Sequence, residues 1–246
     1  MFSVIYRKFI QEKNMESYNL SHQQLFALSL TAPILVTGPN PSYNTLATDT
    51  PQASANLLSS WWDITTEEDL RKTLHWLENE GGHTVYFIQC LKKLERMSFL
   101  QRRDYIAGLM ATNRDEYVRA KLTEHYRLDL GRFTVLAFDI ARITLLVRTG
   151  HDVGWIDEQE AWTLLLRQAD KIITNRMWGS HFDYLYSYMV GRAFGMKKDV
   201  AGIIESVNTA HALLTNYQSP WLSYAPWPKF TETDVAENSN TKQPLH

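Results

Sequence analysis

The chain of 246 residues contains few of the residues that mark specialised protein classes. It has one cysteine, Cys90, so an internal disulfide and a Cys-rich zinc site are both excluded by count. Glycine and proline together contribute only 19 residues, which excludes collagen-like and low-complexity chains. Cys90 lies in an apolar run with helical spacing, and we interpret it as a small core residue rather than a reactive thiol.

An excess of one charge sign and long apolar runs are also missing. The formal charge is −2, whereas proteins that coat nucleic acid or an acidic membrane surface usually carry a positive excess. The most apolar candidate span, 25–36, is interrupted by polar residues and is shorter than the ~20 residues needed to cross a bilayer. The N-terminus lacks the continuous apolar stretch of a signal peptide. We therefore expect a soluble, cytoplasmic protein with no membrane partner.

Short catalytic signatures are absent as well. The sequence has no G-x-G-x-x-G, no P-loop, no H-E-x-x-H and no G-x-S-x-G motif. His75 and Glu78 have the spacing to share a metal on one helix, but no further ligand is evident beside them. The sequence thus predicts no cofactor and no metal site, and it identifies no reaction.

Helical periodicity dominates what is present. Hydrophobic residues make up 44% of the chain and aromatic residues 12%, enough for a large core. Ser21, Asp157 and Ser180 stand where helix caps are expected, and Thr65 with Glu68 has capping-box spacing. We predict an all-α fold whose helices cover 21–35, 65–80, 83–97, 131–149, 161–174, 181–194 and 197–217.

The connections suggest one folded unit. Residues 38–60 are rich in Pro, Ser, Thr, Asn and Asp, and we expect a long N-terminal loop there, with room for a small hairpin near 43–64. Gly150 is predicted to end the central helix. We predict a single helical domain over 1–231 and a polar, disordered C-terminal tail over 232–246.

The helix over 131–149 carries two ions on one face. At 100° per residue Asp139 and Arg142 lie one turn apart, and apolar side chains surround the helix, which indicates a central position. Burying either ion alone would cost several kcal/mol. We therefore expect them to pair, and the five N–H donors of the guanidinium require further polar partners.

Other polar and aromatic residues are candidates to join this pair. Trp62 and Asp63 precede the second predicted helix, and Tyr188 and Arg192 share a face of the helix over 181–194. The predicted cluster comprises Trp62, Asp63, Asp139, Arg142, Tyr188 and Arg192. Two interpretations remain open: a buried structural network, which we favour, or a ligand site with Asp139 as the candidate catalytic base.

Basic residues gather between 92 and 121. Eight Lys and Arg residues stand there against four acidic residues, at helical intervals between apolar positions. This pattern is more typical of a solvated helix face than of a nucleic-acid surface, which would add aromatic stacking platforms. We find no strong nucleic-acid signal.

The run from Ala137 to Gly195 resembles a bacterial family catalogued as domain of unknown function 1266. The resemblance covers about residues 20–195, the family-like core. One departure is that Gly179 and Ser180 follow Trp178, where the family more often places its Trp just after a Ser. The matching elements are Asp139 with Arg142, Gly150 with Gly154, Glu160-Ala161-Trp162, Trp178, Tyr188, Gly191-Arg192 and, upstream, Trp62-Asp63-Ile64.

The resemblance implies a mostly helical, intracellular bacterial protein without an established activity. Family members are similar to accessory proteins encoded beside secreted-toxin and chaperone loci. We therefore favour a non-enzymatic interaction protein, an accessory or immunity-like factor with a protein partner. The aromatic segment 221–227 can anchor such a partner, or it can pack the C-terminal part of the chain onto its own domain. The alternative is an enzyme or small-ligand binder that uses Asp139, Arg142 and Arg192 for an anionic ligand. The sequence leaves the oligomeric state open.

Overall fold

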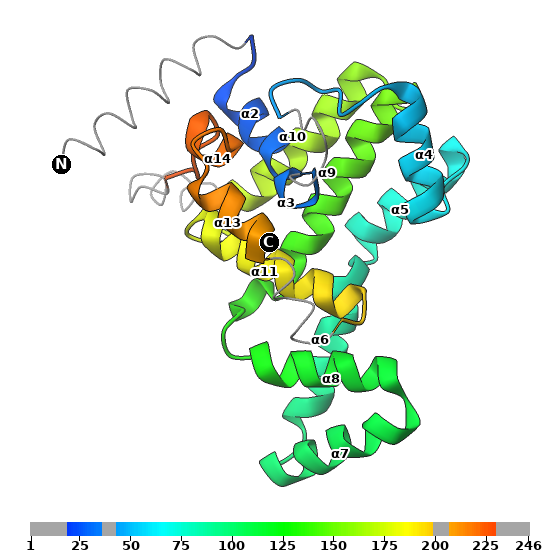
Figure 1. Ribbon diagram of the computed structural model, residues 1–246, viewed down its shortest axis with the longest axis vertical. Coiled ribbons are helices and arrows are strands. Elements are labelled where there is room, and N and C mark those ends of the chain that lie inside the picture. The colour runs from blue at the N-terminus through cyan, green and yellow to red at the C-terminus, as the bar shows by residue number, and fades with distance from the viewer. Residues whose placement is uncertain (1–18, 36–42, 199–206, 230–246) are drawn as a thin grey trace, which may run out of the picture.

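Helices are the only regular secondary structure in the part of the chain that the structure describes. The structure is a computed structural model that describes residues 19–35, 43–198 and 207–229 (Figure 1). These residues contain no strand, which confirms the all-α prediction. The elements are α2 (His22–Ser29), α3 (Ala32–Leu35), α4 (Pro51–Trp62), α5 (Glu67–Asn79), α6 (Gly82–Glu95), α7 (Phe99–Thr112), α8 (Arg114–Tyr126), the 3-10 turn η1 (Gly131–Phe133), α9 (Leu136–Asp152), α10 (Glu158–Thr174), α11 (His181–Gly195), α13 (Val207–Thr215) and α14 (Pro220–Ser223).

Helix α9 occupies the centre, as predicted. Every residue from Ala137 to Gly150 is buried, and helices α4, α5, α10 and α11 pack around it. Gly150 does not end the helix, which continues to Asp152. A Cβ at Gly150 would lie 2.5 Å from the Leu70 side chain and 2.9 Å from that of Ile156, so the glycine permits close packing rather than a turn.

Most predicted helix starts are confirmed. The side chains of Ser21, Asp157 and Ser180 each accept the expected backbone hydrogen bond. The predicted capping box at Thr65 is wrong by one residue, because Thr66 is the N-cap and Asp69 returns the bond to its N–H. The predicted first helix is interrupted after Ser29, and Pro33 lies in the first turn of α3, where its missing N–H is tolerated.

The predicted long loop over 38–60 is wrong in its second half. Residues 51–62 form α4, and no hairpin is present in 43–64. The Thr50 side chain accepts from the Ala53 N–H, and Pro51 occupies the first helical position, for which its fixed φ is suited. The helix buries Leu58 against the core.

A buried arginine fixes the chain just before α4. Arg148 of α9 has no exposed surface, and its guanidinium donates to the carbonyl oxygens of Leu46 (3.1 Å), Thr45 (3.2 Å) and Ala47 (3.0 Å). It also donates to the Thr31 hydroxyl at 2.7 Å. Burial lowers the pKa of Arg148 to about 10. The sequence did not single out this residue.

Helices α6, α7 and α8 form an arm that projects from the rest of the molecule (Figure 1). A second core cluster, which includes Phe87, Val118 and Phe194, joins α6 and α8 to α11. Helix α7 packs on α8, and Leu109 is its only buried residue. Cys90 on α6 is partly buried, in line with its interpretation as a packed residue, and burial raises the pKa of its thiol.

The aromatic segment 221–227 packs on its own domain. Trp221 is buried, stacks on His181 with ring centroids 4.7 Å apart, and donates its indole N–H to the Ser29 carbonyl. Burial lowers the pKa of His181 to about 3. The predicted tail over 232–246 and the central part of the predicted helix over 197–217 lie outside the described residues. No helix among those described is long and apolar enough to span a bilayer.

Candidate functional site

A cavity of about 660 Å³ lies where α3, α4, α9, α11 and α13 meet the start of α6. It has the size of an ordinary small-molecule pocket. The described residues that line it are Pro33, Ile34, Trp61, Trp62, His83, Phe138, Arg142, Tyr188, Arg192, Gly195, Met196 and Thr209.

Arg142 is the most buried charge in the cavity wall, with 8% of its surface exposed. Its Nη1 donates to Oδ1 of Asp139 at 3.2 Å and to Nδ1 of His83 at 2.5 Å. Burial lowers the pKa of Arg142 to about 10, and the negative charge of Asp139 opposes that shift. The guanidinium therefore stays cationic at neutral pH.

Aromatic rings surround this cation. The central carbon of the Arg142 guanidinium lies 4.7 Å from the ring centroid of Trp62, 4.7 Å from that of Phe138 and 5.4 Å from that of Trp76. A desolvated cation–π contact contributes about 2 kcal/mol. The rings thus hold the cation in a place that water reaches poorly.

Three of the five N–H donors of Arg142 have no acceptor among the described residues. The hydrogen bonds to Asp139 and His83 use both protons of Nη1, which leaves Nε and Nη2. Because the side chain is nine-tenths buried and its remaining surface lines the cavity, we place these donors at the cavity wall.

Asp139 lies behind the cavity and has no exposed surface. Its Oδ1 accepts from the His83 N–H (3.1 Å) as well as from Arg142, and its Oδ2 accepts from the Thr84 N–H (2.8 Å) and hydroxyl (2.6 Å). The N-cap residue of α6, Gly81, has no side chain to offer. A carboxylate from α9 therefore caps α6 across the helix interface.

Glycine at position 82 makes this approach possible. Gly82 has φ +50°, and a Cβ there would lie 2.7 Å from Oδ1 of Asp139. Gly195 allows a second close approach at the cavity, since its Cβ would lie 2.8 Å from the Phe138 ring and 2.9 Å from the His83 ring. These two glycines set the distances between α6, α9 and α11.

Tyr188 and Arg192 complete the polar part of the wall. Tyr188 is 3% exposed, and burial raises its pKa to about 12, against the opposing charges of Arg192 and Arg142. Its hydroxyl is therefore protonated at neutral pH. His83 accepts from Arg142 through Nδ1, which places the ring proton on Nε2.

The structure brings together four of the six predicted site residues at the cavity: Trp62, Arg142, Tyr188 and Arg192. Asp139 does not line the cavity, but it accepts a hydrogen bond from Arg142. Asp63 is apart, because it is the exposed C-cap of α4 with φ +53°, and its N–H donates to the Leu58 carbonyl. The sequence reasoning missed His83, Thr84 and Phe138. A usable signal was the Gly81-Gly82 helix start, whose N–H groups need an acceptor from elsewhere.

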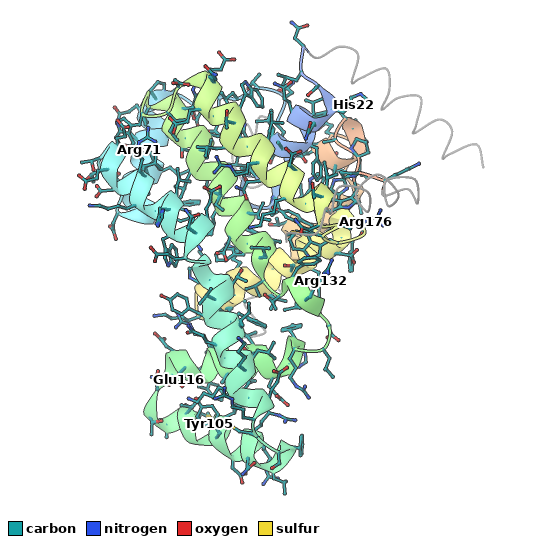
Figure 2. All side chains as sticks on the ribbon, turned by 180° about the vertical axis from the view of Figure 1, so that it is seen from behind. His22, Arg71, Tyr105, Glu116, Arg132 and Arg176 are labelled. Carbon is teal, nitrogen blue, oxygen red and sulfur yellow. The ribbon has the colours of Figure 1, made fainter. Side chains whose placement is uncertain are left out.

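The basic residues of 92–121 lie on the arm and several are paired with acids. Lys93 lies 3.1 Å from Glu116, which also accepts from the Tyr105 hydroxyl at 2.5 Å, and Arg102 lies 3.0 Å from Glu124. Figure 2 shows Tyr105 and Glu116 at the outer end of the arm. The pairing fits the interpretation of a solvated helix face.

His75 and Glu78, which have metal-ligand spacing in the sequence, contact different partners. His75 lies 3.7 Å from Glu80, and Glu78 accepts from Arg167 and Gln168 of α10. Within the described ranges, no group of three or more His, Cys, Asp or Glu is placed to hold a metal ion.

A protein family described as "Protein of unknown function (DUF1266)" matches residues 57–227. The chain belongs to this family. The family match begins later and ends later than the resemblance drawn from the sequence, so it contains the cavity residues of this DUF1266 chain from α4 to α13 but not those of α3.

A curated relative of this DUF1266 protein is the "Uncharacterized protein YbeR" of Escherichia coli (strain K12). It is 26% identical over 137 residues, and the match spans 56% of each chain. No solved structure matches the chain.

Proposed function

We propose that this DUF1266 protein binds a small organic anion in the cavity beside Arg142. One observation carries the proposal: a nine-tenths buried cation retains three donors without an acceptor in the described part of the chain. A hydrogen bond to a charged group contributes about 1.5–3 kcal/mol. An anion that accepts from Nε and Nη2 would gain such bonds.

The charges of the wall support an anion rather than a neutral ligand. The lining residues that the structure describes include Arg142 and Arg192 and no acidic residue. Asp139 lies behind the wall and accepts from Arg142. Paired arginines are common where carboxylate or phosphate groups bind, because hydrogen bonds between ions are about twice as strong as neutral ones.

Positioning, not catalysis, is the role that we propose for Asp139. A general base must reach the proton that it removes, at about 2.6–3.2 Å. The Asp139 carboxylate accepts four hydrogen bonds and is absent from the lining of the cavity. We therefore propose that it is a positioning residue, which orients Arg142 and the start of α6.

Thermal denaturation with a panel of anions tests the proposal. Benzoate, 1-naphthoate and inorganic phosphate are compared with chloride at equal ionic strength. We expect an organic anion to raise the Tm of the wild type and Arg192→Ala to lose most of that rise. Arg167→Ala, an exposed arginine on α10, is the control. If the wild type shows no rise beyond chloride with any of the three, the proposal is wrong.

A protein-interaction role is our second candidate, and α7 supports it. This helix of 14 residues buries only Leu109, while Phe99, Leu100 and Met110 are exposed. Helices of this length are marginal in water without tertiary packing. An additional surface that covers α7 would account for its apolar face.

We propose a second copy of the chain as that surface. Large Phe99 and Leu100 begin the exposed face, and small Ala107 and Ala111 flank Met110 toward its end, so an antiparallel copy can set Phe99 and Leu100 over the two alanines. The exposed Arg103–Asp104 pair can exchange partners between the two copies.

Sedimentation velocity over a range of concentrations tests this self-association. We expect a reversible dimer that Ala107→Glu abolishes and that Thr163→Glu, at an exposed position of α10, leaves intact. A monomer at every concentration rejects the second candidate without bearing on the cavity.

A further inference from the structure

We infer that the anion is a monocarboxylate on an aromatic or other apolar body, held side-on by Arg142. This inference rests on the proposed function and names the class of its ligand. It follows from the shape of the free donors, the composition of the walls and the direction of the surrounding helices.

The free donors of Arg142 form a flat fork. With Nη1 occupied by Asp139 and His83, the remaining edge of the guanidinium presents the parallel N–H groups of Nε and Nη2. A carboxylate accepts both in one plane, which is the bidentate arrangement that arginine favours. The fork therefore selects a group with two coplanar oxygens.

The walls beyond the fork are apolar. Trp61 and Met196 line the cavity while exposing 66% and 54% of their surfaces, so they lie at its mouth. Deeper in the cavity, Trp62, Phe138 and Ile34 face the same space. An aromatic or branched body would cover these side chains and remove their apolar surface from water.

Two helix ends at the cavity, those of α4 and α11, disfavour a dianion such as a phosphate monoester, and one, the first turn of α13 with Thr209, favours an anion. Helix α4 ends at Trp62 and α11 ends at Gly195, and both residues line the cavity. Each helix C-terminus carries about half a negative charge, which repels two charges more than one. Phosphate sites use free N–H groups at a helix N-terminus. The start of α6 does not offer the N–H groups of His83 and Thr84, since Asp139 accepts from both.

Three probes that share one ring test the head group. Isothermal titration of the full chain compares 1-naphthoate, 1-naphthyl phosphate and 1-naphthalenemethanol, with acetate and inorganic phosphate as probes without a ring. We expect 1-naphthoate to bind at least tenfold more tightly than the phosphate ester or the alcohol. Acetate should bind at least a hundredfold more weakly than 1-naphthoate, because it has no body to cover the walls.

Two variants locate the binding. Arg142→Lys keeps the charge but loses the fork, so the affinity for 1-naphthoate should fall at least tenfold. Trp61→Ala removes a side chain that is exposed at the mouth of the cavity and is not needed for folding. It should lower the affinity for 1-naphthoate several-fold without changing the affinity for inorganic phosphate. Phe182→Ala, at an exposed aromatic outside the cavity, is the matched control.

The outcomes test the proposed function and the carboxylate inference separately. Tighter binding of 1-naphthyl phosphate than of 1-naphthoate overturns the carboxylate inference and leaves the proposed function standing. Binding of inorganic phosphate alone overturns both, because the proposed ligand is an organic anion. Equal binding of the alcohol and the acid, or no binding of any anion, overturns both. Tight 1-naphthoate binding that neither Arg142→Lys nor Trp61→Ala weakens places the ligand elsewhere and also overturns the inference.

Discussion

Thr84 donates both its backbone N–H and its hydroxyl to Oδ2 of Asp139, a residue 55 positions away on another helix. The first turn of a helix normally finds its acceptor in the residue just before it. Here the acceptor comes from α9, the helix that also carries Arg142. The start of the arm and the cation of the cavity are therefore fixed by one carboxylate.

Replacing Asp139 by Asn should destabilise the fold by about 3 kcal/mol. The substitution keeps the shape of the side chain but removes the charge that pairs with buried Arg142, and loss of one partner of a buried pair costs about 3–5 kcal/mol. Urea denaturation measures the difference. Asp104→Asn, which breaks an exposed pair with Arg103, should change stability by less than about 1 kcal/mol. Equal effects of the two substitutions would contradict the buried role of Asp139.

Gly82→Ala should cost more than Gly131→Ala. Both glycines have positive φ, +50° and +59°, so both substitutions carry the left-handed backbone penalty of about 1–2 kcal/mol. Only the Cβ at position 82 meets the Asp139 carboxylate, since nothing lies within 4 Å of one at position 131. Thermal or urea unfolding of the two variants isolates the contact, and a smaller loss for Gly82→Ala would rule it out.

Tyr188 should make the fold sensitive to alkali. Burial raises its pKa from the ordinary value of 10 to about 12, so the folded state prefers the neutral phenol. The stability that depends on this preference is fully present below pH 10 and is lost as the pH rises from 10 to 12, by up to about 3 kcal/mol. Tyr188→Phe should flatten that part of the pH profile of unfolding, whereas Tyr217→Phe, at an exposed tyrosine, should not.

Arg148→Lys should release the segment before α4. A lysine retains the charge but lacks the planar donors that reach the carbonyl oxygens of Thr45, Leu46 and Ala47, so we expect a loss of about 3 kcal/mol. Amide hydrogen exchange should accelerate over 43–49 more than elsewhere. Arg167→Lys on the surface of α10 is the control, and uniform acceleration along the chain would argue against a local clamp.

Local signals predicted α2, α5, α6, α9, α10 and α11 but missed α4, α7 and α8, and they began the central helix at 131, where the structure has a 3-10 turn before α9 starts at Leu136. The caps at Ser21, Asp157 and Ser180 were readable because each bond is made within four residues. Thr50-Pro51 carried the same kind of signal, but the polar residues around it suggested a loop. Gly150 looked like a stop because its reason, contact with Leu70 and Ile156, lies outside its own helix.

The candidate site divides in the same way. Helical spacing was enough to pair Asp139 with Arg142 and to place Tyr188 and Arg192 on one face. It could not supply His83 or Thr84, which reach Asp139 only through the crossing of α6 and α9. Asp63 was included for its charge beside Trp62, yet it is the left-handed residue that ends α4 and it does not line the cavity.

The Asp139 carboxylate gives the arm and the cavity a common anchor. An anion held by Nε and Nη2 restrains the guanidinium whose Nη1 donates to Oδ1 of Asp139, and so restrains the carboxylate that accepts from the His83 and Thr84 amides. The backbone amides in the first turn of α6 therefore report whether the cavity is occupied. Their exchange with heavy water should slow when the cavity fills, although Thr84 itself lines no part of it.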